Sequence, residues 1–181
     1  MTFFHGSPVG KLDELKPFLS EHGKPYIYFS TNPLVALLYA VKPVPKPFSF
    51  YPYGFDSDGK VVYSEYFKNA FYELYKNKKG YLYECDDLQK IDNPTTINSA
   101  FTCTKNLKPD RVTEIPDLYD YFINAQNNGL FCIKTYDEIS DKEMSFAISE
   151  IKKDVKSHNL TNEPQHPMTI FVSTHFPNIF E

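Results

Sequence analysis

The sequence of 181 residues has no tryptophan and a single arginine, Arg111. Clefts that bind the phosphates of an RNA end use several arginines, because each guanidinium group holds phosphate oxygens in pairs. The net charge is −4 and no run of basic residues is present, which disfavours binding to a nucleic-acid backbone. The composition therefore argues strongly against an RNA-end phosphotransferase and does not favour a nucleic-acid partner.

Long apolar runs are missing as well. No segment approaches the roughly 20 apolar residues that cross a bilayer, and the N-terminus lacks the basic and apolar regions of a signal peptide. The three cysteines, Cys85, Cys103 and Cys132, are an odd number without C-x-x-C spacing, and the five histidines show no metal-ligand spacing. We expect a cytoplasmic protein with reduced thiols, no metal site and no membrane partner.

Aromatic residues are abundant, with 14 tyrosines and 16 phenylalanines making up 17% of the chain. A tyrosine combines an apolar ring with a polar tip, which suits pockets and interfaces. Equally, aromatic rings fill the core of a chain that has only seven glycines. The aromatic content alone does not choose between these interpretations.

Hydrophobic periodicity and turn residues predict short strands interleaved with short helices. Strands are expected at residues 2–5, 25–31, 80–85, 111–115 and 130–134, with one more ending near Cys103. Helices are expected over residues 31–41, 65–77, 116–129 and 139–160, with a short helical turn at residues 12–15. The segment from residue 167 onward is ambiguous between helix and strand. The pattern predicts the α+β class, and without a glycine-rich strand-to-helix turn it disfavours a doubly wound dinucleotide fold.

Helix starts are marked most clearly. Asn32 is a plausible N-cap, and Pro33 suits the first helical position. Ser140 and Glu143 have the spacing of a capping box ahead of an apolar stripe. A stripe of that kind is far more often core than a cofactor site.

A proline-rich and aromatic stretch separates the second strand region from the third. Four prolines between residues 43 and 52 forbid regular helix and central strand. We expect an ordered inserted loop over residues 42–63, closed by a turn at Asp58 and Gly59. The loop either serves function or only packs. The expected organisation is a domain of residues 1–135 that carries this loop, followed by a helical extension of residues 136–181 packed on it.

Three short segments carry candidate chemistry. The first is His5-Gly6-Ser7 at the end of a strand, and the second is Tyr28-Phe29-Ser30, where a strand leads into the helix that bears Tyr39. The third is a set of acidic residues at and after the end of the strand GYLYE: Glu84, Asp86, Asp87 and Asp92.

Together these segments resemble the ADP-ribosyltransferase superfamily. The His-Gly-Ser opening and the Tyr28 and Tyr39 pair, eleven residues apart, resemble the histidine and tyrosine motifs of the poly(ADP-ribose) polymerase branch. The order FFHGS, IYFS, GYLYE, NPT is similar to that of the rifampin ADP-ribosyltransferases. The resemblance covers roughly residues 1–135 and implies a split β-sandwich that binds NAD between two small sheets.

The resemblance also implies roles for individual residues. The backbone of Gly6 would hold the nicotinamide amide with help from Ser7, and His5 would bond a ribose hydroxyl. Tyr28 and Tyr39 would enclose the nicotinamide ring by offset stacking. The expected catalytic and NAD-binding residues are His5, Gly6, Ser7, Tyr28, Phe29, Ser30, Tyr39, Glu84 and Asp92.

A carboxylate would grip the ribose and stabilise its developing positive charge. Asp92, directly before Asn93-Pro94-Thr95, is the first candidate, because the rifampin-modifying branch uses an aspartate before a similar turn. Glu84 is the second. The polymerase branch places a glutamate at the start of a late strand, and this chain has no obvious glutamate there.

The sequence thus predicts an NAD-dependent mono-ADP-ribosyltransferase, a glycosyltransferase that releases nicotinamide. The acceptor is a protein side chain, a nucleic-acid base or a small molecule. The alternative is an inactive module of the same fold that binds a nucleotide-like ligand or a protein. Simpler structural roles also stand: Asp92 as a turn cap, Tyr28 and Tyr39 as core rings, and His5 as a satisfied strand-end histidine.

Overall fold

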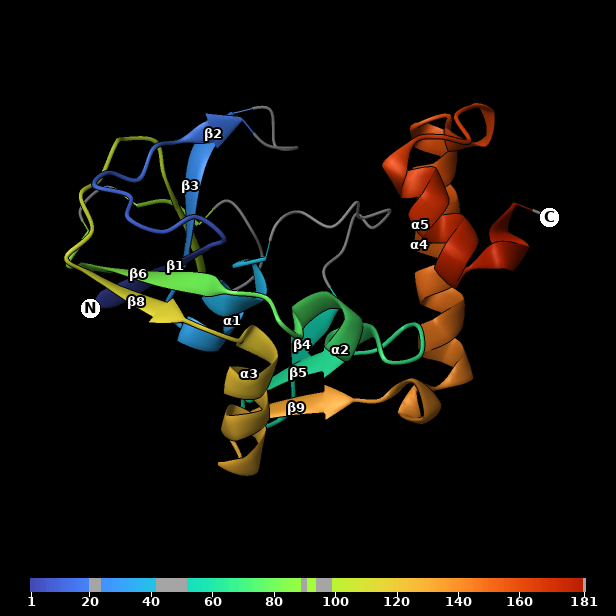
Figure 1. Ribbon diagram of the computed structural model, residues 1–181, viewed down its shortest axis with the longest axis horizontal. Coiled ribbons are helices and arrows are strands. Elements are labelled where there is room, and N and C mark those ends of the chain that lie inside the picture. Colours follow the sequence, from blue (N-terminus) through green and yellow to red (C-terminus); the bar gives the residue numbers. More distant parts are fainter. Residues whose placement is uncertain (20–23, 42–51, 89–90, 94–98, 181) are drawn as a thin grey trace. The chain divides into compact units, whose positions relative to one another are not determined.

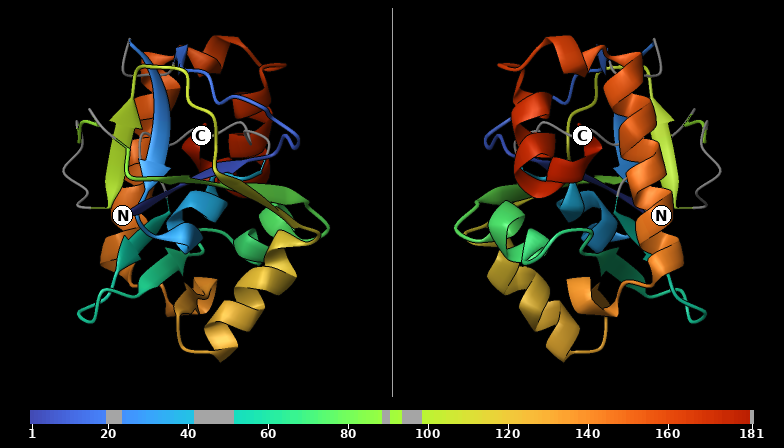
Figure 2. Two further views of the ribbon diagram at one scale, coloured as in Figure 1. Left: turned by 90° about the vertical axis from the view of Figure 1, so that its left-hand side faces the viewer. Right: turned by 90° about the vertical axis from the view of Figure 1, so that its right-hand side faces the viewer.

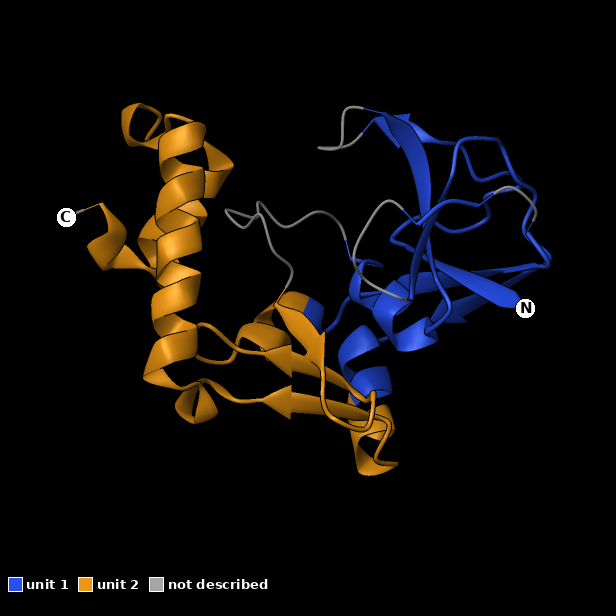
Figure 3. Ribbon diagram, turned by 180° about the vertical axis from the view of Figure 1, so that it is seen from behind, with its two compact units in different colours: residues 1–42, 75–122 blue, residues 43–74, 123–181 orange. Residues whose placement is uncertain are grey.

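The computed structural model describes residues 1–19, 24–41, 52–88, 91–93 and 99–180. The chain divides into two compact units, shown in two colours in Figure 3. Unit 1 contains Met1–Lys42 and Tyr75–Phe122, and unit 2 contains Pro43–Leu74 and Ile123–Glu181. The predicted boundary at residue 135 falls inside unit 2, which also contains residues 43–63 of the predicted inserted loop. The main sheet is antiparallel and the chain also forms helices, so the predicted α+β class is confirmed.

Unit 1 is built on one antiparallel sheet. Its strands are β1 (Thr2–Ser7), β2 (Phe18–Leu19), β3 (Pro25–Ser30), β6 (Gly80–Asp86), β7 (Ala100–Cys103) and β8 (Arg111–Ile115). The order is β2-β3-β1-β6-β8, and β7 also pairs with β3. Figure 1 shows β1, β6 and β8 side by side. The strands predicted from the sequence in this unit are therefore confirmed, whereas the short edge strand β2 was not expected.

Apolar side chains on alternate strand positions make the core of unit 1. The cluster contains Phe3, Leu15, Ile27, Phe29, Tyr83, Cys85 and Cys103. Leu15 belongs to it through a backbone bridge to Leu107, with N–H to O distances of 2.7 and 3.0 Å. The helical turn predicted at residues 12–15 is therefore wrong, because burying Leu15 requires this extended pairing.

Helix α1 (Pro33–Leu38) follows β3 in unit 1. The Asn32 side chain accepts a hydrogen bond from the Leu34 N–H at 2.9 Å, and Pro33 occupies the first turn, which confirms the predicted start. The helix ends at Leu38, three residues before the predicted end. Its five residues from Leu34 to Leu38 are all buried.

Unit 2 contains a small sheet of β4 (Tyr53–Phe55), β5 (Val61–Ser64) and β9 (Phe131–Lys134). Strands β4 and β5 form an antiparallel hairpin, and β9 runs parallel to β5. In the hairpin turn the Asp56 carboxylate accepts the N–H groups of Asp58 and Lys60, and Gly59 has φ of 79°. The predicted turn is confirmed, and half of the predicted loop is this hairpin. Residues 42–51 of that loop lie outside the described residues.

The described part of unit 2 from residue 136 onward is mainly helical. It contains η1 (Tyr136–Glu138), α4 (Asp141–Ser157), η2 (Leu160–Asn162), α5 (Pro167–His175) and η3 (Pro177–Ile179). Figure 2 shows α4 as one long helix with α5 beside it. Ile151 and Val155 of α4 pack with Phe171 and Val172 of α5 in one apolar cluster. The Ser140 and Glu143 capping box is confirmed, with the Ser140 N–H donating to Glu143 at 2.9 Å.

Helices α2 (Ala70–Tyr75) and α3 (Leu118–Asn127) each cross a boundary between the units. Helix α2 starts five residues later than predicted. The reason lies in Glu65, which is 7% exposed and accepts the N–H of Phe71 at 2.8 Å, while Asn69 has a left-handed φ of 58°. A turn therefore occupies residues 65–69.

Within the described segments, no helix is both long and apolar enough to cross a membrane.

Candidate functional site

The predicted histidine lies where β1 and β3 stop pairing as a regular ladder. Their register pair is Phe4 with Ser30. Continued antiparallel pairing would place Gly6 opposite Tyr28. Instead, Nδ1 of the His5 ring lies 2.9 Å from the Tyr28 carbonyl oxygen. A side chain therefore spans the two strands where backbone hydrogen bonds would otherwise run.

This contact fixes the state of the imidazole. A carbonyl oxygen only accepts hydrogen bonds, so Nδ1 of His5 carries the proton and donates it. Burial lowers the pKa of the His5 imidazole below its ordinary value, and the hydrogen bond to Tyr28 opposes that shift in part. The ring is thus neutral near pH 7, and Nε2 keeps its lone pair as an acceptor.

Gly6 is required by packing. A Cβ built on Gly6 would lie 1.9 Å from the carbonyl oxygen of Ala36 and 3.3 Å from the Ala40 nitrogen. Helix α1 therefore lies directly on β1 at this residue. The N–H and C=O groups of a strand residue point within the plane of the sheet, whereas α1 lies on the face of the sheet, where a Cβ would point.

The two serines of the candidate segments both stabilise turns. Ser7 is 7% exposed, and its hydroxyl accepts the Val9 N–H at 3.1 Å. Ser30 is 3% exposed, and its hydroxyl accepts the Asn32 N–H at 3.0 Å. These hydroxyl oxygens hold the chain where β1 and β3 end, and each keeps a second lone pair and a proton.

Strand alternation separates the His5 ring from the Tyr28 ring. The His5 ring lies 6.0 Å from Phe29 and 6.3 Å from Tyr83 on the face that carries the core of unit 1. Tyr28 is next to Phe29 in β3 and so points to the opposite face. There it lies 5.9 Å from the Phe18 ring and 6.0 Å from the Tyr26 ring. The structure thus brings His5 to the backbone of Tyr28 and not to its ring.

The face that carries Tyr28 also carries α1. Phe4 and Ser30 are directly opposed and share one face of the sheet. Gly6 is two residues after Phe4 and Tyr28 is two residues before Ser30, so both lie on that same face. Tyr39 follows α1 as its C-cap residue and is 43% exposed. Tyr28 is half-buried, whereas Phe29 is only 3% exposed and belongs to the core. Tyr28 thus points to the face on which α1 lies, and Tyr39 directly follows α1.

Asp92 lies in register with Tyr28. It bridges to Thr102 through two backbone hydrogen bonds of 3.0 and 2.7 Å, and Thr102 is paired with Tyr28. Directly opposed residues in antiparallel strands share a face. Asp92 therefore stands on the same face as Tyr28, two strand spacings or roughly 10 Å away. Its side chain is exposed to solvent.

Glu84, the second acidic candidate, is engaged in an ion pair. Its carboxylate accepts hydrogen bonds from Arg111 at 2.8 and 3.1 Å, and Asp86 lies 3.6 Å from the same guanidinium group. Glu84 is paired with Phe4 in β1, whereas Asp92 lies beyond β7. The single arginine of the chain thus holds Glu84 against β8.

Sequence reasoning missed Tyr83. This side chain is fully buried, and its hydroxyl donates to the Val9 carbonyl at 2.8 Å and accepts the Leu12 N–H at 3.2 Å. It fixes the loop that follows His5. The signal was present in GYLYE, since Tyr83 and Tyr81 alternate with Leu82, but the partners across the chain could not be read from it.

The cysteines and carboxylates of the described residues form no group of three or more that could hold a metal ion. Cys85 and Cys103 are buried free thiols, and Cys132 is half-buried. Burial raises the pKa of the Cys85 thiol to about 11, so that it is protonated near neutral pH. Cys85 is thus part of the core and unsuited to act as a nucleophile.

Comparison of the chain with protein-family models, with curated proteins and with solved structures finds no significant match.

Proposed function

We propose that this chain is an NAD-dependent mono-ADP-ribosyltransferase with the fold of the ADP-ribosyltransferase superfamily. The observation that carries the proposal is the hydrogen bond between His5 and the Tyr28 carbonyl. It joins the two sequence segments that resemble the family's histidine and tyrosine motifs. The ends of these segments lie in one unit, next to the helix that leads to Tyr39.

In this proposal the nicotinamide end of NAD binds on the face that carries Tyr28 and Tyr39. The backbone of Gly6 holds the carboxamide, and the two tyrosine rings enclose the pyridine ring by offset stacking. His5, whose ring lies on the opposite face of the sheet, holds the Tyr28 carbonyl through its Nδ1 hydrogen bond and so positions the strand that carries Tyr28. Ser7, Phe29 and Ser30 hold the ends of β1 and β3 in place.

The proposed reaction breaks the bond between the ribose and the nicotinamide nitrogen. The bonding electron pair leaves with nicotinamide, and positive charge develops on the ribose, as in glycoside hydrolysis. An acceptor nucleophile then attacks the opposite side of the ribose. A carboxylate that stabilises this charge more in the transition state than in the ground state raises the rate.

We assign that carboxylate to Asp92. It shares a face and a register with Tyr28 through Thr102. Glu84 is a weaker candidate because Arg111 already neutralises it. A carboxylate that is paired with a guanidinium group offers less electrostatic stabilisation to a developing cation.

The second candidate is an inactive module of the same fold that binds a nucleotide-like ligand or a protein. Two observations favour it: the Arg111 ion pair of Glu84 and the solvent exposure of Asp92. Catalytic groups act best in sites from which water is excluded. The two candidates predict different outcomes when NAD is supplied.

The test measures nicotinamide release from NAD by the wild type, Asp92→Ala and Glu84→Ala. The transferase proposal expects release by the wild type, a loss of at least about 100-fold in Asp92→Ala, and a small change in Glu84→Ala. NAD binding without release by any variant would favour the module. Neither binding nor release would remove the transferase and would leave only a module that binds a protein or another ligand.

A further inference from the structure

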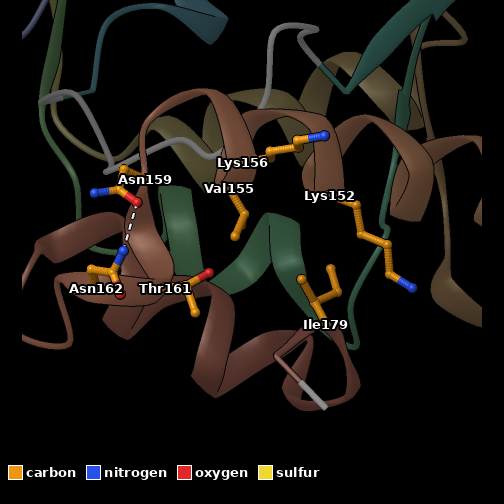
Figure 4. A pocket seen from close by; sticks show the side chains of 7 residues that line it. All are labelled: Lys152, Val155, Lys156, Asn159, Thr161, Asn162 and Ile179. Carbon is orange, nitrogen blue, oxygen red and sulfur yellow. Dashed lines mark hydrogen bonds between the residues drawn. The ribbon is translucent and has the colours of Figure 1, made fainter.

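A cavity in the helical part of unit 2 stands apart from the candidate transferase residues. It has a volume of about 400 Å³ and lies between α4, η2 and η3. Volumes of this size are typical of sites for small molecules. Figure 4 shows the side chains that line it.

The lining residues combine positive charge with hydrogen-bond donors. Lys152 and Lys156, one helical turn apart on α4, lie on one side, and Asn159 and Asn162 lie on the other (Figure 4). Among the described residues that line the cavity, none is acidic. The cavity therefore favours an anion over a cation.

The two lysines form no ion pair with a described residue. Their neighbour Lys153, by contrast, pairs with Glu150. Both lysine side chains are exposed, and in Figure 4 their ammonium groups are turned outward from the cavity. Rotation about the flexible lysine stems brings them over a bound anion, since each stem has four rotatable bonds.

The two asparagines orient each other. Nδ2 of Asn162 donates to Oδ1 of Asn159 at 2.7 Å, which directs the remaining N–H groups of both amides away from this bond. Asn159 adopts a left-handed φ of 55° at the end of α4, a conformation that asparagine tolerates. Thr161 adds a hydroxyl to the same lining, and in Figure 4 its oxygen points toward the cavity.

Two apolar side chains, Val155 and Ile179, complete the lining. Val155 is 6% exposed and packs in the apolar cluster of unit 2, and Ile179 of η3 packs against that cluster. In Figure 4 both side chains lie between the lysines and the asparagines. A ligand that fits this lining carries an anionic group for the donors and an apolar group for Val155 and Ile179.

We propose that this cavity binds a small phosphate monoester. Its phosphate carries nearly two negative charges at neutral pH, which matches the two ammonium groups. Its oxygens accept hydrogen bonds from Lys152, Lys156 and the Thr161 hydroxyl, and its organic group lies on Val155 and Ile179. The site is independent of the proposed transferase activity, because none of its residues belongs to the candidate NAD-binding segments.

The test is a titration of the ¹⁵N-labelled full chain with phenyl phosphate, followed by NMR at constant ionic strength. We expect shifts of the side-chain amide signals of Asn159 and Asn162. Lys152→Gln and Lys156→Gln should each weaken binding at least about 5-fold, since each removes a charge-assisted hydrogen bond. Lys142→Gln, which removes a charge from an exposed position near the start of α4, should change binding less than about 2-fold.

Two ligand controls separate the parts of the proposal. Inorganic phosphate should shift the same signals with weaker affinity, and phenol alone should not shift them. No shift with phenyl phosphate, equal weakening by Lys142→Gln, or equal binding of phenol would each overturn the proposal. Because the lysines are exposed, their substitution should leave the fold intact. The same spectra verify that every variant is folded.

Discussion

Nδ1 of His5 donates a hydrogen bond to the carbonyl oxygen of Tyr28 across the point where β1 and β3 separate. Because burial lowers the pKa of the His5 imidazole, the unfolded chain takes up a proton at a higher pH than the folded chain does. The contribution of the neutral His5 ring to the free energy of unfolding is therefore fully present above the ordinary pKa of histidine. It is lost as the pH falls below about 6.5 toward the folded-state pKa.

This yields the first prediction. Between pH 7.5 and 5.5 the wild type should lose more unfolding free energy than His5→Gln, by at most about 1.4 kcal/mol per pH unit. Urea unfolding at both pH values measures the difference. The remaining histidines are present in both proteins and cancel. Equal pH dependence in the two proteins would show that burial of His5 is not linked to stability.

The second prediction concerns Gly6. Gly6→Ala places a methyl group 1.9 Å from the Ala36 carbonyl oxygen, and backbone on both sides must shift. We expect a loss of about 2 to 3 kcal/mol in unfolding free energy, within the range of overpacked cores. Gly54→Ala is the matched control, because a Cβ there meets nothing within 4 Å. A tolerated Gly6→Ala would mean that α1 does not rest on β1 at this residue.

The third prediction concerns Tyr83. Tyr83→Phe removes the bonds to Val9 and Leu12 and leaves both backbone groups without that partner. The expected loss of stability is about 1 to 2 kcal/mol. Hydrogen exchange at the Leu12 amide should also accelerate more than exchange at the amides of β6. Unchanged exchange at Leu12 would contradict the assigned contact.

The fourth prediction concerns the start of α4. The Lys134 ammonium group and the Ser140 hydroxyl and N–H lower the pKa of Glu143 to about 2. Because this pKa is lower than in the unfolded chain, the stabilisation is present above about pH 4.5 and is lost as the pH falls toward 2. Glu143 is 37% exposed, so we discount the shift for solvent screening and expect about 1 to 2 kcal/mol.

Glu143→Gln checks this prediction by urea unfolding. The variant should be less stable than the wild type at pH 7, and the two should converge near pH 2 to 3. A difference in unfolding free energy between the two proteins that stays constant with pH would show that the charge of Glu143 does not contribute to the stabilisation.

The starts of α1 and α4 were predictable because their signals are local. The Asn32 cap and the Ser140 and Glu143 box involve residues within three positions of each other. Helix α5 was ambiguous from sequence, although it begins with a comparable signal: the His166 ring accepts the N–H of Met168. A histidine cap is uncommon and was not recognised as a start.

Features that depend on distant partners were not predictable. The bridge between Leu15 and Leu107 joins segments 92 positions apart, and it overrides the local helical preference of residues 12–15. Likewise, Gly6 was assigned to ligand approach, whereas the position of Ala36 gives it a packing role. The sequence predicted that His5 and Tyr28 are neighbours, but not that their rings lie on opposite faces of the sheet.

The central claim is that Gly6, Tyr28 and Tyr39 together receive the nicotinamide end of NAD, with Asp92 as the nearest effective carboxylate. A crystal structure of the full chain soaked with nicotinamide tests it most directly. The account predicts the carboxamide hydrogen-bonded to the backbone of Gly6 and the pyridine ring between the two phenol rings. Nicotinamide bound elsewhere, or an unoccupied Gly6 at saturating ligand, would contradict it.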